Sequence, residues 1–502
     1  MLKKLVKRKE EIFRPFESSN DYKNRKRVLI EEKSINNNIK FMNSMSEVFN
    51  ELNIDANMTL SFHHHLRNGD FVQNMVSEEI LKRDIKDLHY APSSIFPSNA
   101  ILSKLIENKN VISIDTNYLN GPVATTIGEG KLQGLLMMNT HGGRPRKIES
   151  GELSIDVAFI ACPAVDKEGN GYGGIGPAAC GSLGYAISDL KYAKKVVLVT
   201  DSIFDELPKI ELEKKYVDIV LKVDKIGDQN GILSGTTKIT KDPVGLKIAA
   251  LTTKLLNELG LIKDGFSMQT GAGGTSLAVA SYVKDLMIKN KIKGSFASGG
   301  ITGIFVEMQK MGLFERLNDV QCFDIDAVKS YNDNPNHYGM SGSKYANPYD
   351  DPICDQLDFV ILGATEIDKN FNVNVTTDSY GRIMGGSGGH SDTAHGANVT
   401  VITTNLIKSR MPIIKDRVTT ITTPGEDVDV LVTERGIAIN PKRKDLLEKL
   451  VNTKLPIYTI DELYEMAHSI TGVPKKIELS NEIIGYVQYR DGSIIDKLYK
   501  YN

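Results

Sequence analysis

The chain has 502 residues, of which 41% are hydrophobic and 25% charged, a composition typical of a globular protein with several domains. Its 61 Lys and Arg residues balance 63 Asp and Glu residues, and the net charge of −2 argues against a nucleic-acid partner. The four cysteines have neither metal-type nor disulfide-framework spacing and no apolar run is long enough for a membrane span, so we expect a cytoplasmic protein without membrane contact.

The chain begins with the basic segment MLKKLVKRKEEIF, which lacks the apolar core of a signal peptide. We expect residues 1–30 to form a solvated N-terminal tail before the first domain.

Three consecutive histidines follow a strand-like run in MTLSFHHHLRNGD, residues 58–70. On a strand, His63 and His65 share one face and His64 points to the other. The His63 and His65 pair can contribute two ligands to zinc, but a catalytic zinc site needs a third protein ligand and the chain has no H-E-x-x-H signature. Hydrogen-bonded core histidines are the plainer alternative.

A glycine turn with several cations follows in THGGRPRKIESGE, residues 140–152. Arg144, Arg146 and Lys147 surround the turn, and guanidinium groups bind carboxylates through two parallel hydrogen bonds. Solvated loop charges are an equally good interpretation of each one.

The chain repeats itself once. DVAFIACPAVDKEGN at 156–170 matches DFVILGATEIDKNFN at 358–372, and AKKVVLVTD at 193–201 matches ANVTVITTN at 397–405. Each copy reads as a buried strand followed by its loop, which favours two similar α/β halves.

We expect the two halves to span residues 31–235 and 236–502, joined in the Gly- and Lys-rich stretch 222–243. The second half continues with a helical pattern at 244–260 that Gly260 can end, then a strand-like FSMQT and a glycine turn before another helix. This order predicts mostly parallel sheets flanked by helices.

Three glycine turns follow strand-like segments in the second half: QTGAGGTS at 269–276, ASGGITG at 297–303 and GGSGGHSD at 385–392. Any one of them alone is as well explained by a tight turn, and none has the full dinucleotide fingerprint. Together they predict one ligand crevice at the carboxyl ends of a parallel sheet.

These motifs, with LGATEIDKNFNVNV and EDVDVLVTERGIAINP (426–441), resemble in this order the α subunit of bacterial ATP-independent citrate lyase, from about residue 30 onward. The resemblance implies an α/β fold of two tandem CoA-transferase-like halves, each with a mostly parallel sheet flanked by helices. It also implies an enzyme, a citrate CoA-transferase, that moves the acyl-carrier thioester from acetyl to citrate.

One motif departs from the related CoA-transferases, which use the glutamate of an S-E-N-G turn as covalent acyl acceptor. The matching turn here runs from Ala297 to Gly300, so Ser298 stands where that glutamate would be. We therefore expect the citrate carboxylate to attack the acetyl thioester directly, giving a mixed anhydride without an acyl-enzyme.

The resemblance implies roles for three groups of residues. The backbone at His63–His65 would form an oxyanion loop, with imidazole N–H groups as further donors, although alternation leaves a structural role open for His64. Ser298, Gly299 and Gly300 would belong to the catalytic site as well. Arg67, Asn68, Arg144 and Arg146 would hold citrate. The expected contacts to the thioester arm are Gly271, Gly273, Gly274, Glu366, Gly385, Gly386, Gly388, Gly389, His390 and Asp392, with no metal.

The implied partners are citrate, an acyl carrier protein (the γ subunit) and a citryl-carrier lyase (the β subunit), with several copies of the chain in a larger complex. The chain would bind no cofactor of its own; the carrier would deliver a phosphoribosyl-dephospho-CoA arm, for which acetyl-CoA can substitute. Three alternatives stay open: the same chemistry on citramalate, a ligand sensor without turnover, and a zinc hydrolase built on His63 and His65.

Overall fold

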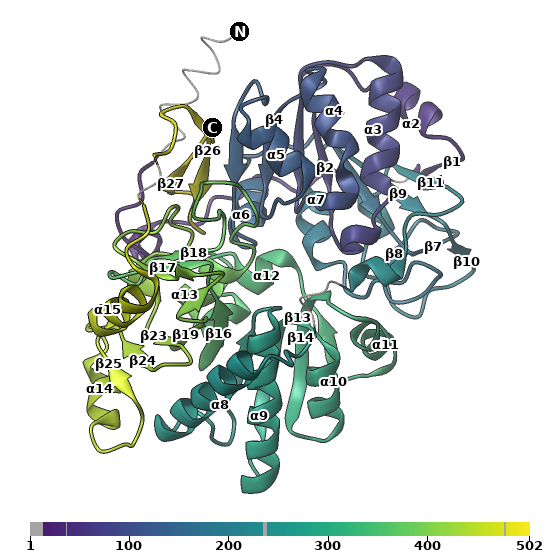
Figure 1. Ribbon diagram of the computed structural model, residues 1–502. Helices are drawn as coiled ribbons and strands as arrows, with labels where there is room; N and C mark the ends of the chain where they lie inside the picture. Colours follow the sequence, from purple (N-terminus) through teal and green to yellow (C-terminus); the bar gives the residue numbers. More distant parts are fainter. Residues whose placement is uncertain (1–13, 37, 234–237, 476–477, 502) are drawn as a thin grey trace.

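Two large sheets, each with helices on its faces, organise the protein (Figure 1). The structure is a computed structural model that describes residues 14–36, 38–233, 238–475 and 478–501. Both sheets are parallel apart from the β26–β27 and β23–β24 pairs, which are antiparallel. The predicted α/β class with two sheet-and-helix halves is confirmed.

The first half contains a ten-stranded sheet. In spatial order its strands are β1 (Lys40–Met42), β11 (Ile219–Lys222), β9 (Lys195–Thr200), β6 (Val157–Ala161), β2 (Thr59–Phe62), β3 (Leu88–Pro92), β4 (Val111–Thr116), β5 (Leu136–Met138), β26 (Ile483–Gln488) and β27 (Ile494–Tyr499). Its helices are α2 (Met45–Leu52), α3 (Val72–Arg83), α4 (Ile101–Glu107), α5 (Pro122–Gly128), α6 (Gly143–Glu149) and α7 (Ile187–Tyr192).

The second half contains a nine-stranded sheet. Its strands in order are β15 (His337–Gly339), β14 (Phe314–Cys322), β13 (Gly294–Ile301), β12 (Ser267–Thr270), β16 (Phe359–Gly363), β19 (Val399–Thr403), β23 (Val430–Val432), β24 (Ile437–Ile439) and β25 (Ile457–Tyr458). Its helices are α8 (Pro243–Glu258), α9 (Gly274–Asn290), α10 (Gly303–Lys310), α11 (Ile325–Asp333), α12 (Gly342–Ala346), α13 (His390–Gly396), α14 (Lys444–Leu450) and α15 (Ile460–Thr471).

Three small sheets lie outside the two large ones. They comprise β7 (Ala164–Asp166), β8 (Gly171–Tyr172) and β10 (Ile203–Phe204); β17 (Glu366–Asp368), β18 (Val373–Asn374) and β22 (Ile414–Lys415); and β20 (Ile407–Lys408) with β21 (Met411–Pro412). Among the helices of the described segments, none combines the length and the apolar character that a bilayer crossing demands.

Local signals explain where α8 lies. Its N-cap is Asp242, whose carboxylate accepts a hydrogen bond from the backbone N–H of Gly245. Pro243 occupies the first turn, where a backbone N–H would have no partner within the helix, so its missing N–H costs nothing. The helix stops before Gly260, which has a φ of +70°. The helix predicted over 244–260 is thus confirmed to within two residues at each end.

The internal repeat is a structural repeat. Asp156 accepts a hydrogen bond from the backbone N–H of Thr59 at the start of β2, and Asp358 accepts the same bond from Ser267 at the start of β12, both at 2.8 Å. Asp166 and Asp368 each bind two backbone N–H groups of the loop that follows them. Strands β2 and β12 therefore hold equivalent positions in the two halves.

The C-terminal hairpin crosses to the first half. β26 pairs in parallel with β5, with Gly485 opposite Leu136, and in Figure 1 this yellow hairpin lies beside the blue β4 and α5. We expected all of residues 236–502 to belong to the second half, but the hairpin belongs to the sheet of the first half. It covers the edge of β5, which would otherwise have no partner strand. The expected boundary between residues 235 and 236 lies outside the described residues.

The end of the expected tail is packed on the protein. Ser19 and Tyr22 are buried, and the Ser19 backbone N–H donates to Glu426. The Ile30 backbone N–H donates to the carbonyl oxygen of Glu149. The segment from residue 14 to residue 22 is therefore partly packed on the protein, whereas residues 25–30 are exposed. Two buried side chains in a polar stretch are too weak a pattern to predict the packed part. Residues 1–13 lie outside the described residues.

Candidate functional site

A pocket of about 480 Å³ lies between the two halves, where strands of both sheets end. Most of its first-half lining follows β2, β3, β4 and β5, and most of its second-half lining lies at or after the ends of β12, β13, β14 and β16 or in the loop before α13. Tyr185, Tyr345 and Val375 complete the wall from other segments. Among the described residues that line it, none is an aspartate or a glutamate. Those with polar side chains are His64, Arg67, Ser94, Tyr118, His141, Tyr185, Gln269, Thr270, Gln321, Tyr345, Thr365, Ser387 and His390.

Arg67 supplies the pocket with a cation that has no acidic partner. Its guanidinium carbon lies 5.5 Å from the centre of the Phe96 ring and 5.0 Å from that of Phe323. Its Nη1 is buried without a hydrogen-bond partner, and no carboxylate of the described residues pairs with it. Burial lowers the pKa of Arg67, but guanidinium remains protonated. An unpaired cation in a pocket without acids is suited to an anionic ligand.

His64 is the histidine of the triplet that lines the pocket. Ser93 Oγ accepts a hydrogen bond from the His64 backbone N–H at 3.1 Å and lies 2.6 Å from His64 Nδ1. Ser93 Oγ has one proton and a second lone pair, so it can donate to Nδ1, with the ring proton on Nε2, or accept from Nδ1–H. Burial, reinforced by His141 and His65, holds the pKa of His64 well below its usual range. His64 is therefore a neutral donor.

His63 and His65 lie outside the pocket lining, with ring centres 6.0 Å apart. His63 Nε2 is 3.0 Å from Asp189 Oδ2, and Arg144 contacts the same carboxylate. Strand β2 ends at Phe62, before the triplet, and the His65 ring also stacks on that of His64, 6.3 Å between centres. The Arg144 guanidinium next to His63 also disfavours a divalent cation there.

Arg144 and Arg146 are engaged elsewhere in the protein. Arg144 donates two hydrogen bonds to Asp189, at 2.7 and 2.8 Å, and others to Ser61 and the Ala91 carbonyl. Arg146 makes a two-bond contact with Glu152, at 2.6 and 2.7 Å. Asn68 is exposed and outside the lining. Of the four residues expected to hold citrate, the pocket contains Arg67.

The turn after β12 forms an open part of the wall. A Cβ on Gly271 or Gly273 would meet no atom closer than 3.7 Å, so both positions face free space. Gly274 packs against the Lys238 carbonyl and lies outside the lining. The 17-residue helix α9 starts here with Gly273 as its N-cap and no side-chain cap. Its first backbone N–H groups are left for solvent or a ligand.

The glycine loop before α13 joins the halves. Gly385, Gly386, Gly388 and Gly389 line the pocket. The Gly388 carbonyl accepts a hydrogen bond from the His141 backbone N–H at 2.8 Å, and the Gly388 N–H donates to the Asn117 carbonyl. His390 uses both ring nitrogens within the second half, on Thr423 and the Gly363 carbonyl, and burial lowers its pKa to about 4.

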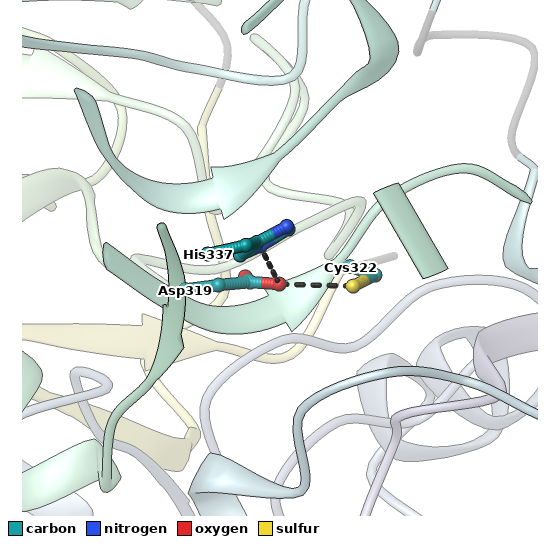
Figure 2. Close-up of side chains that lie close together, drawn as sticks. All are labelled: Asp319, Cys322 and His337. Carbon is teal, nitrogen blue, oxygen red and sulfur yellow. Dashed lines mark hydrogen bonds and ion pairs between the residues drawn. The ribbon is translucent and has the colours of Figure 1, made fainter. Parts of the chain in front are cut away.

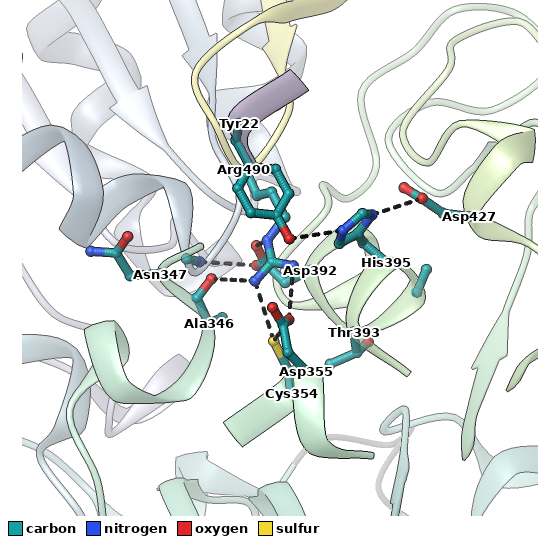
Figure 3. A network of polar contacts seen from close by, with 12 residues as sticks. Tyr22, Ala346, Asn347, Cys354, Asp355, Asp392, Thr393, His395, Asp427 and Arg490 are labelled. Atoms are coloured by element: carbon teal, nitrogen blue, oxygen red, sulfur yellow. Dashed lines mark hydrogen bonds and ion pairs between the residues drawn. The ribbon is translucent and has the colours of Figure 1, made fainter. Parts of the chain in front are cut away.

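The two acidic residues expected near the thioester arm are structural. Glu366 is buried and accepts hydrogen bonds from Asn374, Ser379 and Thr419. Asp392 accepts from Thr140 Oγ1 at 2.8 Å and from the Gly142 backbone N–H at 2.9 Å, and Arg490 lies 3.7 Å away (Figure 3). Burial raises the pKa of Asp392 to about 6. Neither lines the pocket.

The turn that carries Ser298 lies within β13. Gly299 has a φ of +102°, and a Cβ there would stand 2.4 Å from the Gln269 side chain. Gly300 lines the pocket, whereas Ser298 does not, and the buried Ser298 Oγ has no hydrogen-bond partner among the described residues. The place of the acyl-accepting carboxylate is thus filled by small side chains.

Several polar residues at the pocket were missed by sequence reasoning. Among them are His141, Tyr185 and Gln321, which line the pocket, and Asn117, which contacts His141. Gln321 donates to the His64 carbonyl at 2.8 Å, and the Tyr185 ring stacks on His64 with 4.9 Å between centres. His141 lies within the motif THGGRPR and was the one with a sequence signal. Asn117 and Gln321 lie near strand ends and Tyr185 in a short 3-10 helix, all in segments without a motif.

A second cluster of reactive side chains lies outside the pocket lining (Figure 2). The ligand-type atoms of Asp319, Cys322 and His337 lie within 4.8 Å of one another. Cys322 Sγ donates to Asp319 Oδ2 at 2.9 Å, His337 Nε2 is 3.1 Å from the same oxygen, and His337 Nδ1 is 3.0 Å from Ser330 Oγ. Since each ring nitrogen, the thiol and Oδ2 already have partners, we interpret the cluster as a polar contact between β14 and β15.

Comparisons with known proteins agree on one family. Residues 38–501 match the family model described as "Citrate lyase, alpha subunit (CitF)". The chain is 44% identical over 464 residues to the citrate lyase alpha chain of Haemophilus influenzae, covering 92% of this chain and 93% of that one. It is 43% identical over 460 residues to that of Klebsiella pneumoniae, covering 91% and 90%.

Solved structures extend the likeness to the fold. A citrate lyase alpha subunit from Streptococcus mutans, in complex with citrate, has a TM-score of 0.91 and 42% identity, with 94% of each chain covered. A malonate decarboxylase hetero-tetramer from Pseudomonas has a TM-score of 0.61 and 17% identity over 85% of this chain and 82% of the other, a likeness of fold alone.

Proposed function

The chain belongs to the citrate lyase alpha subunit family, the transferase component of that enzyme, and on this premise we propose that its interdomain pocket passes a carrier thioester from acetyl directly to citrate. No residue of the protein becomes acylated in this scheme. Citrate is the expected acceptor, and the related protein from Streptococcus mutans was solved with citrate.

The observation that carries the proposal is the charge of the pocket. Arg67 offers a cation without an acidic partner, and the described lining contains no carboxylate. Citrate brings three carboxylates, which need fixed donors, and one of them must stay free to react. A lining acid would repel citrate and could itself take the acyl group. The absence of an acid from the described lining therefore favours direct transfer.

The reaction has two steps, both with anionic nucleophiles. A citrate carboxylate oxygen attacks the acetyl thioester carbon, the carbon–sulfur bond breaks, and a mixed anhydride and a thiolate form. The thiolate then attacks the citryl carbonyl, the bond from that carbon to the bridging oxygen breaks, and acetate leaves. Each step passes through a tetrahedral oxyanion, which N–H donors stabilise. His64, which is neutral, is our candidate donor in the pocket, in the tautomer in which the Ser93 hydroxyl donates to Nδ1 and the ring proton is on Nε2.

We assign the second half to the thioester arm. Gly271 and Gly273 leave open space, and the uncapped start of α9 presents backbone N–H groups at the same wall. A helix N-terminus favours anions such as the phosphates of a CoA-like arm. In this scheme an acyl carrier protein delivers a phosphoribosyl-dephospho-CoA arm, and a separate β subunit cleaves the citryl thioester.

The test is to mix the purified chain with acetyl-CoA and citrate and to follow acetate and citryl-CoA by mass spectrometry. We expect both products, in amounts that depend on citrate, and initial rates that fit a sequential mechanism. The exposed variant Lys247→Ala on α8 is the matched control. A ping-pong pattern, or activity with citramalate but none with citrate, would overturn the proposal. If acetyl-CoA gives no product, the carrier thioester is tested next.

A further inference from the structure

His141 lines the pocket beside His64, although no sequence argument selected it. It follows β5 directly, and its ring lies 4.5 Å from the Tyr185 ring, centre to centre. The ring centres of His141 and His64 are 5.6 Å apart, and the rings are tilted by only 14°. Two imidazoles of the first half therefore stand almost parallel at one wall.

A hydrogen bond from Asn117 determines the tautomer of His141. The Asn117 side-chain nitrogen lies 2.9 Å from His141 Nδ1. An amide nitrogen only donates, so Nδ1 accepts and the proton of the neutral ring is on Nε2. Nε2 has no partner among the described residues and faces Gly388, whose Cβ position would be 3.3 Å away. The free N–H thus belongs to the pocket wall.

The backbone around His141 is held from both sides. The His141 N–H donates to the Gly388 carbonyl, and Asp392 binds Thr140 Oγ1 and the Gly142 N–H. Arg490, fully buried in the turn of the C-terminal hairpin, approaches Asp392 from the other side and also bonds Asp355 (Figure 3). The turn with His141 is therefore fixed before any ligand arrives, as transition-state stabilisation requires.

We propose that His141 is a second neutral N–H donor, beside His64 at the pocket wall, that binds the oxygen that becomes negative during acyl transfer, and that Asn117 is the positioning residue that keeps this donor on Nε2. The inference rests on the proposed transferase function. The two rings stack with 5.6 Å between their centres, so the two imidazoles occupy neighbouring places at one wall.

The surroundings keep the ring neutral. Burial, with a further contribution from Arg144, lowers the pKa of His141 to about 3. His64 and Tyr185 are the titratable groups that stack on the ring, and Asp392 faces the turn from α13. None of them places a carboxylate on a ring nitrogen. The Nε2–H form is thus present across the whole working pH range.

The first experiment reverses the tautomer. In Asn117→Asp a carboxylate accepts from Nδ1–H and raises the pKa of His141. At low pH the doubly protonated ring still donates from Nε2, whereas above the raised pKa the neutral ring turns a lone pair toward the oxygen. We expect kcat to fall by about 100-fold as pH rises through that pKa, with KM for citrate changed less than threefold. The wild-type protein should show no such step.

Two further measurements make the test independent of any one variant. His141→Gln keeps an N–H near the position of Nε2 and should retain at least tenfold more kcat than His141→Ala. Ring ¹⁵N shifts of labelled histidine report the tautomer without turnover. If wild type fails to transfer acyl groups, the proposed function is lost while the tautomer is still read. Full turnover in His141→Ala, or an Nδ1–H tautomer in wild type, would overturn the role of His141.

Discussion

The two halves end their equivalent strands β2 and β12 in opposite ways. After β2 the chain places His64 and Arg67 in the pocket, and after β12 it places Gly271 and Gly273 there. The first half lines its side of the pocket with fixed polar side chains. The second half leaves open space, because a Cβ added at Gly271 or Gly273 would meet no atom closer than 3.7 Å. In the proposed reaction, this one fold position would bind a small polyanion on one side and a long arm on the other.

The largest effect on stability should come from Arg144, not from the pocket. Arg144→Leu leaves Asp189 buried without its cation, and breaking such a pair costs about 3–5 kcal/mol. Chemical unfolding would measure the loss. Replacing both residues, as in Arg144→Leu with Asp189→Leu, should restore part of it. An unchanged free energy of unfolding for the single variant would refute a structural role.

Arg67→Leu should give the converse result. It removes an unpaired cation, so the free energy of unfolding should hold or rise. Charge-assisted hydrogen bonds are worth about 1.5–3 kcal/mol, so KM for citrate should rise about 10- to 100-fold while KM for acetyl-CoA changes little. Initial rates measured against each substrate in turn give the two KM values separately. An equal rise in KM for both substrates would contradict the proposal that the first half binds citrate and the second half binds the thioester arm.

Gly273→Leu probes the second half in the same way. The backbone at Gly273 has a φ of −73°, which any residue adopts, so the added side chain enters the pocket without backbone strain. We expect KM for acetyl-CoA to rise about tenfold, because overfilling a site costs about 1–3 kcal/mol. Citrate binding, measured by calorimetry, should be unaffected. Weaker citrate binding would mean that citrate lies against the second half of the pocket, which would contradict the proposal.

The effect that builds up gradually with pH concerns a histidine in each half. Burial lowers the pKa of His141 to about 3 and that of His390 to about 4, below the unfolded value of about 6.5. Between these values the unfolded chain binds a proton that the folded chain does not. Stability should therefore fall below pH 6.5, by about 1.4 kcal/mol per pH unit for each ring.

Unfolding curves at several pH values check this slope. His141→Gln and His390→Gln each remove one proton-binding group, so each variant should flatten the dependence by a similar amount. A slope that neither substitution alters would show that other groups control the acid sensitivity.

Much of the fold could be predicted because its signals are local or repeated. The pairs Asp156 with Asp358 and Asp166 with Asp368 mark the same loop twice, and Asp242, Pro243 and Gly260 mark the ends of α8. The return of the hairpin to β5 could not be predicted, because strand pairing over more than 300 residues leaves no local pattern.

Sequence reasoning selected residues that line the candidate pocket where residue type alone decides. Arg67 and the glycine turns line the pocket as expected, because an anion pocket needs a cation and a wide one needs small residues. Arg144, Asp392 and Glu366 have the right chemistry for ligand binding, but each is satisfied by a partner more than ten residues away in the chain. Such partners appear only in three dimensions.

Direct transfer determines where one oxygen atom of the product acetate comes from. If a citrate oxygen bridges the mixed anhydride, it leaves with acetate. We would run a single turnover of the enzyme with acetyl-CoA and citrate labelled with ¹⁸O in its carboxylates, and measure acetate by mass spectrometry. The account predicts that acetate carries one ¹⁸O from the first turnover. Unlabelled acetate would mean that an enzyme carboxylate supplied the oxygen, and would contradict the acid-free pocket as the site of direct transfer.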